Sequence, residues 1–361
     1  MATPKFLNVA GSTFHKELKK RVNDYFTNAQ KPATGNFGLH FKAILFWSCY
    51  VFLYFHVVFF TPPTWVAIIE CVLMGGLTAA IGFNVMHDGG HGSFSNSKFW
   101  NKIAAFSVNA LGASAIMWNN KHNIIHHTYT NIDGIDDDIE IKPMLRMCET
   151  QKKYKIHRYQ HIYVWFLYTF LLIIWVFATD YTKYFKKKVG TVAIKKMSTF
   201  EHFAFWIAKA GYAFMMIALP IYLLGFVQWL LGFLIIAMFA GFILSVVFQL
   251  AHTVEETAFP VAVSDMAKVD TEWIENEWAI HQIETTANFA TRNKLISWLV
   301  GGLNFQIEHH LFPKISHVHY PAISKIIKQT CMEYGVKYIE FRKMRHAVVS
   351  HTLHLKRMGR A

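Results

Sequence analysis

Five long apolar runs divide the chain and predict its architecture. They cover residues 43–60, 65–86, 162–178, 203–224 and 226–251. An α-helix rises about 1.5 Å per residue, so a run of about 20 residues matches a hydrocarbon layer about 30 Å thick. Only residues 61–64 separate the first two runs, and only Gly225 separates the last two. We therefore expect two helical hairpins that cross a membrane.

The middle run, 162–178, is predicted not to cross. It has 17 residues and is the shortest of the five. Basic residues flank both of its ends, and basic flanks mark the cytoplasmic side of a membrane. These flanks are Lys152, Lys153, Lys155 and Arg158 before the run, and Lys183, Lys186, Lys187, Lys188, Lys195 and Lys196 after it. We expect this run to dip into the membrane or to lie flat, which leaves four crossings.

Two further segments are predicted to lie at the membrane surface. Residues 99–118 are moderately apolar but contain polar and small residues, so we expect a re-entrant or interfacial segment there. Residues 14–26 are amphipathic with a basic polar face, which predicts an interfacial helix inside the polar segment 1–40. We expect no cleavable signal in that segment. Lys209, near the start of the third crossing, is expected to extend its amine to the cytoplasmic headgroups.

The remaining sequence completes the expected fold class, which is all-α. Residues 252–361 contain no apolar run of membrane length. We expect a polytopic membrane protein with four transmembrane helices in two hairpins and with re-entrant or interfacial segments. A cytoplasmic helical cap, formed by about 87–200 and 252–361, is expected to hold the functional site. Residues 41–361 are predicted to form a single membrane domain.

Composition agrees with a membrane protein and narrows its partners. Hydrophobic residues make up 53% of the chain and aromatic residues 16%. The net charge of +13 comes from basic residues beside apolar runs, so we interpret it as orientation signals and headgroup contacts, and we expect no nucleic-acid partner. The four cysteines form no CxxC pair, which argues against a disulfide framework and against a thiolate metal site.

Three short motifs contain seven of the histidines. They are HDGGH at 87–91, HNIIHH at 122–127 and QIEHH at 306–310. Histidines four residues apart lie on one face of a helix, where they can share a metal ion. The first two motifs alone offer more nitrogens than one tetrahedral ion uses, so we predict a two-metal site. Imidazole suits iron, zinc, copper and nickel, so the ligands alone do not name the metal.

His252 is an eighth candidate. The last apolar run has 26 residues, more than the hydrocarbon layer requires, so its end should project to the depth of His87 and His91. This placement favours a ligating role and a structural role for His252 equally. The other histidines lack the paired spacing, and we expect surface or packing roles for them, with His281 the first to reconsider. They include His40, His56, His157, His161, His202, His281, His317, His319, His346, His351 and His354.

In order, spacing and membrane context, the three motifs resemble the histidine boxes of the membrane fatty acid desaturases. The resemblance covers about residues 82–321 and includes Leu311-Phe312-Pro313 after the third box. It implies a di-iron centre, O2 as co-substrate and a cis double bond as the product. By matching position it implies eight ligands, which are His87, His91, His122, His126, His127, His252, His309 and His310. Gln306 would ligate weakly, act through a water or only position its neighbours.

Gln306 also suggests the branch of this family. A glutamine at the start of the third box is similar to the front-end desaturases, which act between an existing double bond and the carboxyl end. Many of these carry an N-terminal cytochrome b5 domain, and too few residues precede the first crossing here to hold one. The chain thus resembles the bacterial linoleoyl-CoA-desaturase-like branch. This implies a bacterial plasma membrane, a fatty acyl-CoA or acyl-lipid substrate, and electrons from a separate ferredoxin or cytochrome b5.

Residues beside the boxes have expected supporting roles. Removing hydrogen from an unactivated methylene needs O2 and external electrons, which redox-inert zinc cannot use. Ligating imidazoles usually donate their second N–H to a carboxylate. The candidates are Asp88, Glu308 and the run Asp136-Asp137-Asp138, and of these we expect Asp88 and Glu308 to serve in this way. A solvated role is favoured for Asp137, Lys121 and Arg292. Packing is favoured for three aromatic residues beside the boxes, which are Phe83, Trp118 and Phe305.

Two other functions remain as alternatives. The same scaffold could hydroxylate an acyl chain or oxidise a sphingolipid, because the outcome depends on whether the substrate radical loses a second hydrogen or recaptures oxygen. A metal transporter or sensor is a distant alternative, since it would distribute its ligands through the membrane depth. A zinc peptidase is disfavoured because HDGGH lacks the glutamate of HExxH.

Overall fold

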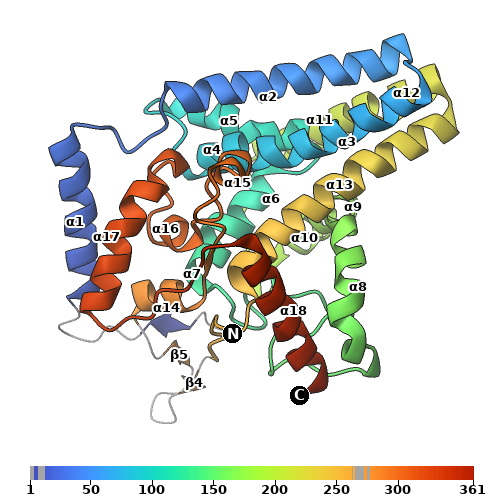
Figure 1. Ribbon diagram of the computed structural model, residues 1–361. Coiled ribbons are helices and arrows are strands. Elements are labelled where there is room, and N and C mark those ends of the chain that lie inside the picture. The colour runs from blue at the N-terminus through green and yellow to red at the C-terminus, as the bar shows by residue number, and fades with distance from the viewer. Residues whose placement is uncertain (1–3, 7–12, 262, 265–271, 275–276) are drawn as a thin grey trace.

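The computed structural model describes residues 4–6, 13–261, 263–264, 272–274 and 277–361 (Figure 1). Parts of the predicted segments 1–40 and 252–361 therefore lie outside the described residues. Five helical runs are long and apolar enough to cross a membrane. They are Phe37–Phe60, Thr64–His91, Lys155–Lys186, Thr199–Leu224 and Phe226–His252. The all-α membrane fold is confirmed, and four of these runs are the predicted crossings.

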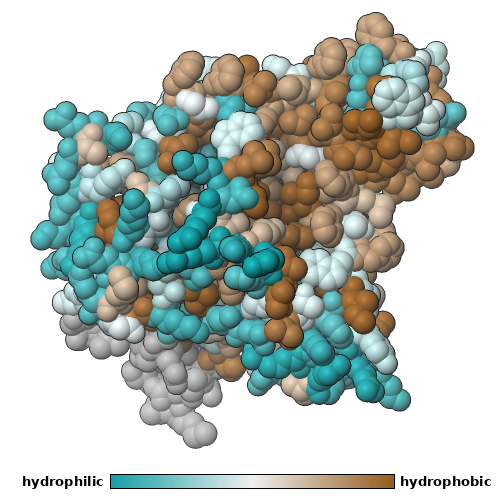
Figure 2. Space-filling view, viewed as in Figure 1, coloured by the Kyte–Doolittle hydropathy of each residue, from teal (hydrophilic) through white to brown (hydrophobic). Residues whose placement is uncertain are grey.

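The two hairpins form one elongated apolar end of the molecule. Their helices are α2 (Phe37–Phe55), α3 (Thr64–Ile81), α4 (His87–His91), α11 (Thr199–Ala213), α12 (Leu219–Leu224) and α13 (Phe226–His252), several of them joined by single π turns. Helices α3 and α13 lie side by side, and apolar side chains cover this end of the molecule (Figures 1 and 2). A Cβ atom at Gly75 would lie 2.8 Å from the carbonyl oxygen of Ile236, so glycine allows this close helix contact.

The fifth run contains α8 (Gln160–Leu167), α9 (Leu171–Ile174) and α10 (Asp180–Lys186). Its middle packs on α13, where Ser245 Oγ donates to the carbonyl oxygen of Tyr168 at 3.1 Å. At the start of α8, Gln160 Nε2 donates to the carbonyl oxygen of Leu355, in α18 (Met344–Arg360). At its other end, Lys183 pairs with Asp137 at 2.5 Å, beside the second histidine motif. Both ends of the run thus contact the part of the molecule that carries the histidines.

The remaining helices surround the histidine motifs. They are α1 (Phe14–Ala29), α5 (Lys98–Ala110), α6 (Ala115–Asn119), α7 (His127–Tyr129), α14 (Trp278–Glu284), α15 (Lys294–Leu299), α16 (Gln306–Leu311), α17 (Tyr320–Glu333) and α18 (Met344–Arg360). Helix α5 has 13 residues, too few to cross, and exposes Phe99, Trp100 and Phe106. That exposed apolar face agrees with the interfacial position predicted for 99–118.

Three small sheets brace the loops. They use β1 (Lys5–Phe6), β2 (Lys188–Val189), β3 (Val192–Ala193), β4 (Val263–Ser264), β5 (Glu272–Ile274), β6 (Asn288–Phe289) and β7 (Glu340–Phe341). In the three-stranded sheet, β5 pairs in parallel with β1 and antiparallel with β4. Strands β2 and β3 form an antiparallel hairpin, and β6 pairs in parallel with β7. The last pair places Asn288, next to the third motif, opposite Glu340.

Helix α1 forms as predicted, but its apolar face does not lie on lipid. Leu18 and Val22 are fully buried in a core cluster shared with Ile323 and Ile327 of α17. Arg21 on the same helix pairs with Glu333 of α17 at 2.7 Å. The apolar face of α1 is long enough for a membrane contact, but the amphipathic helix α17 covers it. Sequence periodicity predicts that this face is buried and does not predict which surface buries it.

Lys209 does not extend to the headgroups as expected. It is buried, and its Nζ pairs with Asp180 at 2.8 Å and donates to the carbonyl oxygens of Gly112 and Val176. A buried charge requires such partners, because desolvation without them is strongly unfavourable. The pair therefore fixes α11 to α10 in the apolar region.

Removing one partner of this ion pair should destabilise the fold. Lys209→Met and Asp180→Asn are each expected to lower the free energy of unfolding by about 3–5 kcal/mol, because the other charge stays buried. The apolar pair Lys209→Met with Asp180→Leu should recover most of that loss. Unfolding midpoints in detergent measure both effects, with the exposed Lys196→Met as the control. Additive losses in the double variant would contradict this account.

Candidate metal centre

The eight predicted histidines meet where α3 and α13 leave the apolar end of the molecule. One group is His87, His91, His122 and His309; another is His126, His252 and His310; a third is His127, His309 and His310. Within each group the candidate ligand nitrogens lie within 4.8 Å of one another. His252 is thus placed with the box histidines. Among the described residues, no histidine outside the predicted eight joins these groups.

Helix continuation places the first motif. The chain runs from α3 through a π turn, Gly82–Met86, directly into α4, so the two histidines of HDGGH leave the membrane helix on one face. A Cβ at Gly90 would strike the ring of Trp118, and one at Gly89 would strike the backbone of Ala105. The two glycines between the histidines therefore let α4 lie directly against α5 and α6.

The second motif also departs from a regular helix. Asn120–His126 forms a seven-residue π-helix that leads into α7, and such widened turns often occur at functional sites. The three histidines of this motif thereby enter three different groups, with His127 in the third. His122 contacts the first group, with its Nε2 3.2 Å from Nε2 of His87, whereas His126 joins the second.

Several buried nitrogens in the cluster have no protein partner. His91 Nε2, His309 Nε2 and His310 Nε2 make no hydrogen bond, although nearly all buried polar atoms have one. His127 Nε2 and His122 Nε2 approach each other to 3.2 Å. Lone pairs that converge without donors are what a bound cation requires. The donor set fits a metal ion, and imidazole nitrogens suit iron among others.

Burial keeps most of these imidazoles neutral. It lowers the pKa of His122, His127, His309 and His310 well below the ordinary value of histidine. A neutral imidazole has a free lone pair, so these four side chains need release no proton to bind a metal at neutral pH.

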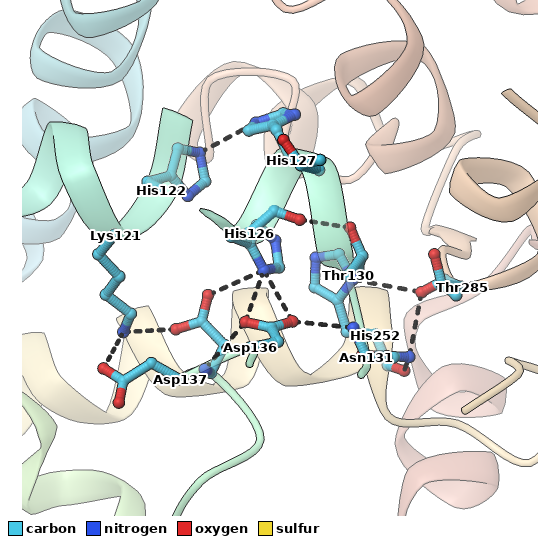
Figure 3. A network of polar contacts seen from close by, with 12 residues as sticks. Lys121, His122, His126, His127, Thr130, Asn131, Asp136, Asp137, His252 and Thr285 are labelled. Atoms are coloured by element: carbon cyan, nitrogen blue, oxygen red, sulfur yellow. Dashed lines mark hydrogen bonds and ion pairs between the residues drawn. The ribbon is translucent and has the colours of Figure 1, made fainter. Parts of the chain in front are cut away.

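His126 differs because carboxylates surround its other nitrogen (Figure 3). Its Nδ1 lies 3.1 Å from both oxygens of Asp136 and 3.2 Å from Asp138. Burial lowers the pKa of His126, but the two negative charges more than offset it, so the pKa is raised overall. A carboxylate at Nδ1 orients the ring and leaves Nε2 for a metal.

Three other ligand candidates are oriented by neutral groups. His309 Nδ1 lies 3.0 Å from the hydroxyl of Tyr320, and His310 Nδ1 lies 2.7 Å from Oε1 of Gln282. His252 Nδ1 lies 3.3 Å from the carbonyl oxygen of Thr285. Each contact holds Nδ1 and leaves Nε2 toward the cluster. These partners come from α14, the loop after it and α17, and no local sequence signal identifies them.

Asp88 and Glu308 have other partners than expected. Asp88 accepts from Ser316 at 2.6 Å and from His317 at 2.9 Å. Glu308 accepts from Asn288 at 2.7 Å and from Tyr338 at 2.8 Å, and burial raises its pKa to about 7. Within the described part of the chain, neither carboxylate has a recorded hydrogen bond to a box histidine. Asp136, ten residues after His126, has that contact instead.

The expectation that three supporting residues are solvated is partly wrong. Lys121 pairs with Asp138 at 2.5 Å and with Asp137 at 3.8 Å, so neither it nor Asp137 is simply a solvated charge. Arg292 is exposed, as expected. His281 is buried against the ring of Phe6 and outside the cluster, and burial lowers its pKa to about 4.

The side chain of Gln306 lies at the second histidine group. Its amide nitrogen is 3.0 Å from Nε2 of His252. The amide oxygen and nitrogen are assigned from the hydrogen-bond network, so a rotated amide would direct its oxygen to the same place. The position agrees with each of the roles that the resemblance implied for this residue.

A narrow apolar cavity ends at His87. It is lined by Thr78, Gly82, Phe83, Met86, His87, Val108, Leu111, Ala113, Leu172, Trp175, Leu244 and Phe248. We call it the slot. Phe83 thus lines a cavity, whereas Phe305 packs in the core beneath α16 and α17. Trp118 stacks on His122 with ring centroids 4.7 Å apart.

A second, wider opening reaches the cluster from the surface. We call it the cleft; it is bordered by α5, α6 and residues 195–197, and His91, Gly90 and Trp118 lie at its inner end. Three exposed lysines line it, which are Lys102, Lys195 and Lys196. Because α5 exposes its aromatic face, the cleft opens at the expected level of the membrane surface.

Fold and site together define a helical membrane protein with a histidine cluster that is able to bind metal. The fatty acid desaturase family matches residues 63–342, and the chain belongs to this family. It is therefore a fatty acid desaturase, an oxidoreductase of lipid metabolism.

Three relatives illustrate the match. The chain is 34% identical over 348 residues to the sn-1 linoleoyl-lipid 6-desaturase of Arthrospira platensis, which covers 96% of this chain and 92% of the relative. It is 35% identical over 357 residues to the enzyme of the same name from Synechocystis sp., with 96% of each covered. It is 33% identical over 362 residues to the acyl-lipid (8-3)-desaturase of Physcomitrium patens, which covers 99% of this chain and 74% of the relative.

The carboxylate at His126 gives a direct test of the site. Asp136→Ala should weaken metal retention by the second histidine group about 10–100-fold, because the ring loses its orienting partner. Metal per chain after dialysis against graded chelator measures this. The control is Asp133→Ala, whose carboxylate pairs with Lys142 away from the cluster. Equal retention in both variants would show that Asp136 does not support a metal ligand.

Proposed function

We propose that this desaturase holds two iron ions and inserts a cis double bond into an acyl chain with O2 and electrons from a separate ferredoxin or cytochrome b5. The observation that carries the proposal is the convergence of eight imidazoles, seven of them on buried residues and several without partners. Two bound irons would supply the oxidising power, which redox-inert zinc lacks. The chain's own residues hold the ions, orient the imidazoles and keep the reacting carbons away from water.

The histidine groups suggest how the ligands divide. One ion would be held by His87, His91, His122 and His309, and the other by His126, His252 and His310. His127 would add to the second site, since its ring stacks on His310 with centroids 4.4 Å apart. Gln306 would complete the second site through its amide oxygen or a water, or would only position His252.

The cleft and the slot suggest the course of the substrate. The cleft reaches His91 from the membrane surface, and the slot continues from His87 between α3 and α13. We infer that the acyl carrier, a lipid or CoA, places its head in the cleft beside Lys102, Lys195 and Lys196. The acyl chain would pass the metal centre and insert its methyl end into the slot, whose apolar lining excludes water.

Gln306 and the relatives support front-end regiochemistry. The names of the relatives specify a linoleoyl-lipid 6-desaturase and an acyl-lipid (8-3)-desaturase. We propose that this chain likewise acts on an already unsaturated acyl-lipid, on the carboxyl side of an existing double bond.

The contacts of the fifth apolar run support a cytoplasmic site and four crossings. Three such runs lie between the second motif and His252, yet both belong to one cluster, so one run does not cross. Lys155–Lys186 is that run, since both its ends contact the histidine-bearing part and both are basic. We place the protein in a bacterial plasma membrane with its metal centre on the cytoplasmic side.

Product analysis tests the function and its regiochemistry. The chain is expressed in a host fed linoleate. The fatty acids are then derivatised, and gas chromatography with mass spectrometry locates their double bonds. We expect a new cis double bond on the carboxyl side of the existing ones, because Gln306 and the named relatives indicate a front-end enzyme. His309→Ala should abolish it, since the loss removes a ligand from the centre.

The matched control is His346→Ala, an exposed histidine outside the cluster, which should retain the product. A new bond toward the methyl end would contradict the front-end assignment, and a hydroxylated chain would favour the alternative oxidation. A product that survives in His309→Ala would contradict the proposed centre.

A further inference from the structure

A hollow with a basic lining lies where the fifth apolar run begins, against the end of α18. Its lining includes Lys153, Tyr154, Lys155, Arg158, Tyr159 and Arg360. We call it the basic pocket. Helices α8 and α18 lie side by side at this corner of the molecule, near the C-terminus (Figure 1). The family match and the histidine cluster assign the pocket no role.

Four of the lining side chains are cations, and they come from two segments that are far apart in the sequence. Lys153, Lys155 and Arg158 belong to the start of the run, and Arg360 ends α18. All four are exposed. Within the described residues, none of the four has a recorded ion pair. The pocket thus concentrates positive charge without a recorded carboxylate that neutralises it.

Protein contacts hold the two sides of the pocket together. Arg146 is buried and donates to the carbonyl oxygen of Met358 at 2.6 Å and to that of Glu149 at 2.7 Å. It thereby ties the end of α18 to the segment before the run. A Cβ atom at Gly359 would strike the carbonyl oxygen of His157, so glycine lets α18 lie directly on the first turn of the run. The four cations are therefore brought together before any ligand binds.

An exposed apolar stripe continues from the pocket along the run. It consists of Ile156, Tyr159, Ile162 and Phe166, which are all exposed and follow one another at intervals of three or four residues. The segment is a 3-10 turn, Lys155–Tyr159, followed by α8, so this spacing places the four side chains on one face. Figure 2 shows hydrophilic residues over the end of α18, with apolar residues beside them. An exposed apolar face on a run of this hydropathy indicates a surface that contacts lipid.

The position of α18 agrees with the level of the lipid headgroups. His351 of α18 has its Nδ1 2.6 Å from the carbonyl oxygen of Thr253, the residue that follows α13. Helix α18 thus packs at the end of the last crossing rather than beside its middle. Anionic lipids of the cytoplasmic leaflet attract basic segments that lie next to a membrane helix.

We propose that the basic pocket binds the phosphate headgroup of an anionic phospholipid, whose acyl chains lie along the apolar stripe. Lysine and arginine bind phosphate through charge-assisted hydrogen bonds, and arginine can form two in parallel. The hydroxyl of Tyr159 can donate a further one. A free phosphate would match the cations but would leave the stripe without a partner. This inference goes beyond the proposed reaction and rests only on the proposed cytoplasmic level of the fifth run.

Thermal unfolding of the full chain in a neutral detergent tests the site, with phosphatidylglycerol and phosphatidylcholine as the probes. A ligand that binds the folded chain alone raises the unfolding midpoint. We expect phosphatidylglycerol to raise the midpoint of the wild-type chain by about 3 °C or more over phosphatidylcholine, because only the first lipid has a net negative headgroup. Equal midpoints in the two lipids would overturn the proposal.

Paired arginine variants make the test specific. Arg158→Gln with Arg360→Gln removes one cation from each side of the pocket, and about 30-fold more phosphatidylglycerol should be needed for the same shift. Arg158→Lys with Arg360→Lys keeps both charges and should keep most of the response. The matched control is Arg292→Gln with Arg345→Gln, which removes two exposed arginines outside the pocket, one of them at the other end of α18. It should respond as the wild-type chain does.

Two further outcomes would overturn the proposal. Equal responses of the two glutamine double variants would show that the lipid follows the net charge of the chain rather than the pocket. Inorganic phosphate is the probe without acyl chains. A shift as large as that with phosphatidylglycerol, lost in Arg158→Gln with Arg360→Gln, would assign the pocket to a soluble phosphate instead. None of these measurements requires desaturation, so failure of the proposed function would appear separately, in the product analysis.

Discussion

The convergence of eight imidazoles in one cluster, seven of them on buried residues, is the constraint on which the rest of the structure depends. Nitrogens such as His91 Nε2 and His310 Nε2 are removed from water without a partner, which is unfavourable unless a cation binds them. They can meet only if α4, the end of α13 and α16 reach the same depth, since each of these helices carries part of the cluster. The π turn before α4 and the length of α13 are the local means to that end.

The acids of the first and third boxes hold the parts of the molecule together. Asp88 of α4 accepts from Ser316 and His317, and His317 in turn lies 3.2 Å from the amine of Lys42 in α2. Through these contacts a membrane hairpin is fixed to the segment before α17. Orientation of the imidazoles falls to residues from elsewhere, above all Asp136. In the first and third histidine motifs, the acidic residues thus hold segments of the chain together, while the histidines are the candidate metal ligands.

The sequence predicted the crossings and the candidate ligands because both depend on local patterns: apolar runs of membrane length and paired histidines. His252 was also within reach, since the length of its helix gives its depth. Contacts between distant segments could not be predicted from the sequence. The partners of Asp88, the burial of Lys209 against Asp180 and the packing of α1 on α17 each depend on which surfaces meet, and several acids or apolar faces were equally suitable by spacing.

X-ray absorption at the iron edge of the purified protein tests the central claim most directly. The proposal predicts a first shell dominated by nitrogen at roughly 2.1 Å, as for imidazole ligands, with the outer scattering of imidazole rings and no sulfur. A shell dominated by sulfur, or one of oxygen without imidazole scattering, would contradict the histidine cluster as the site of the metal.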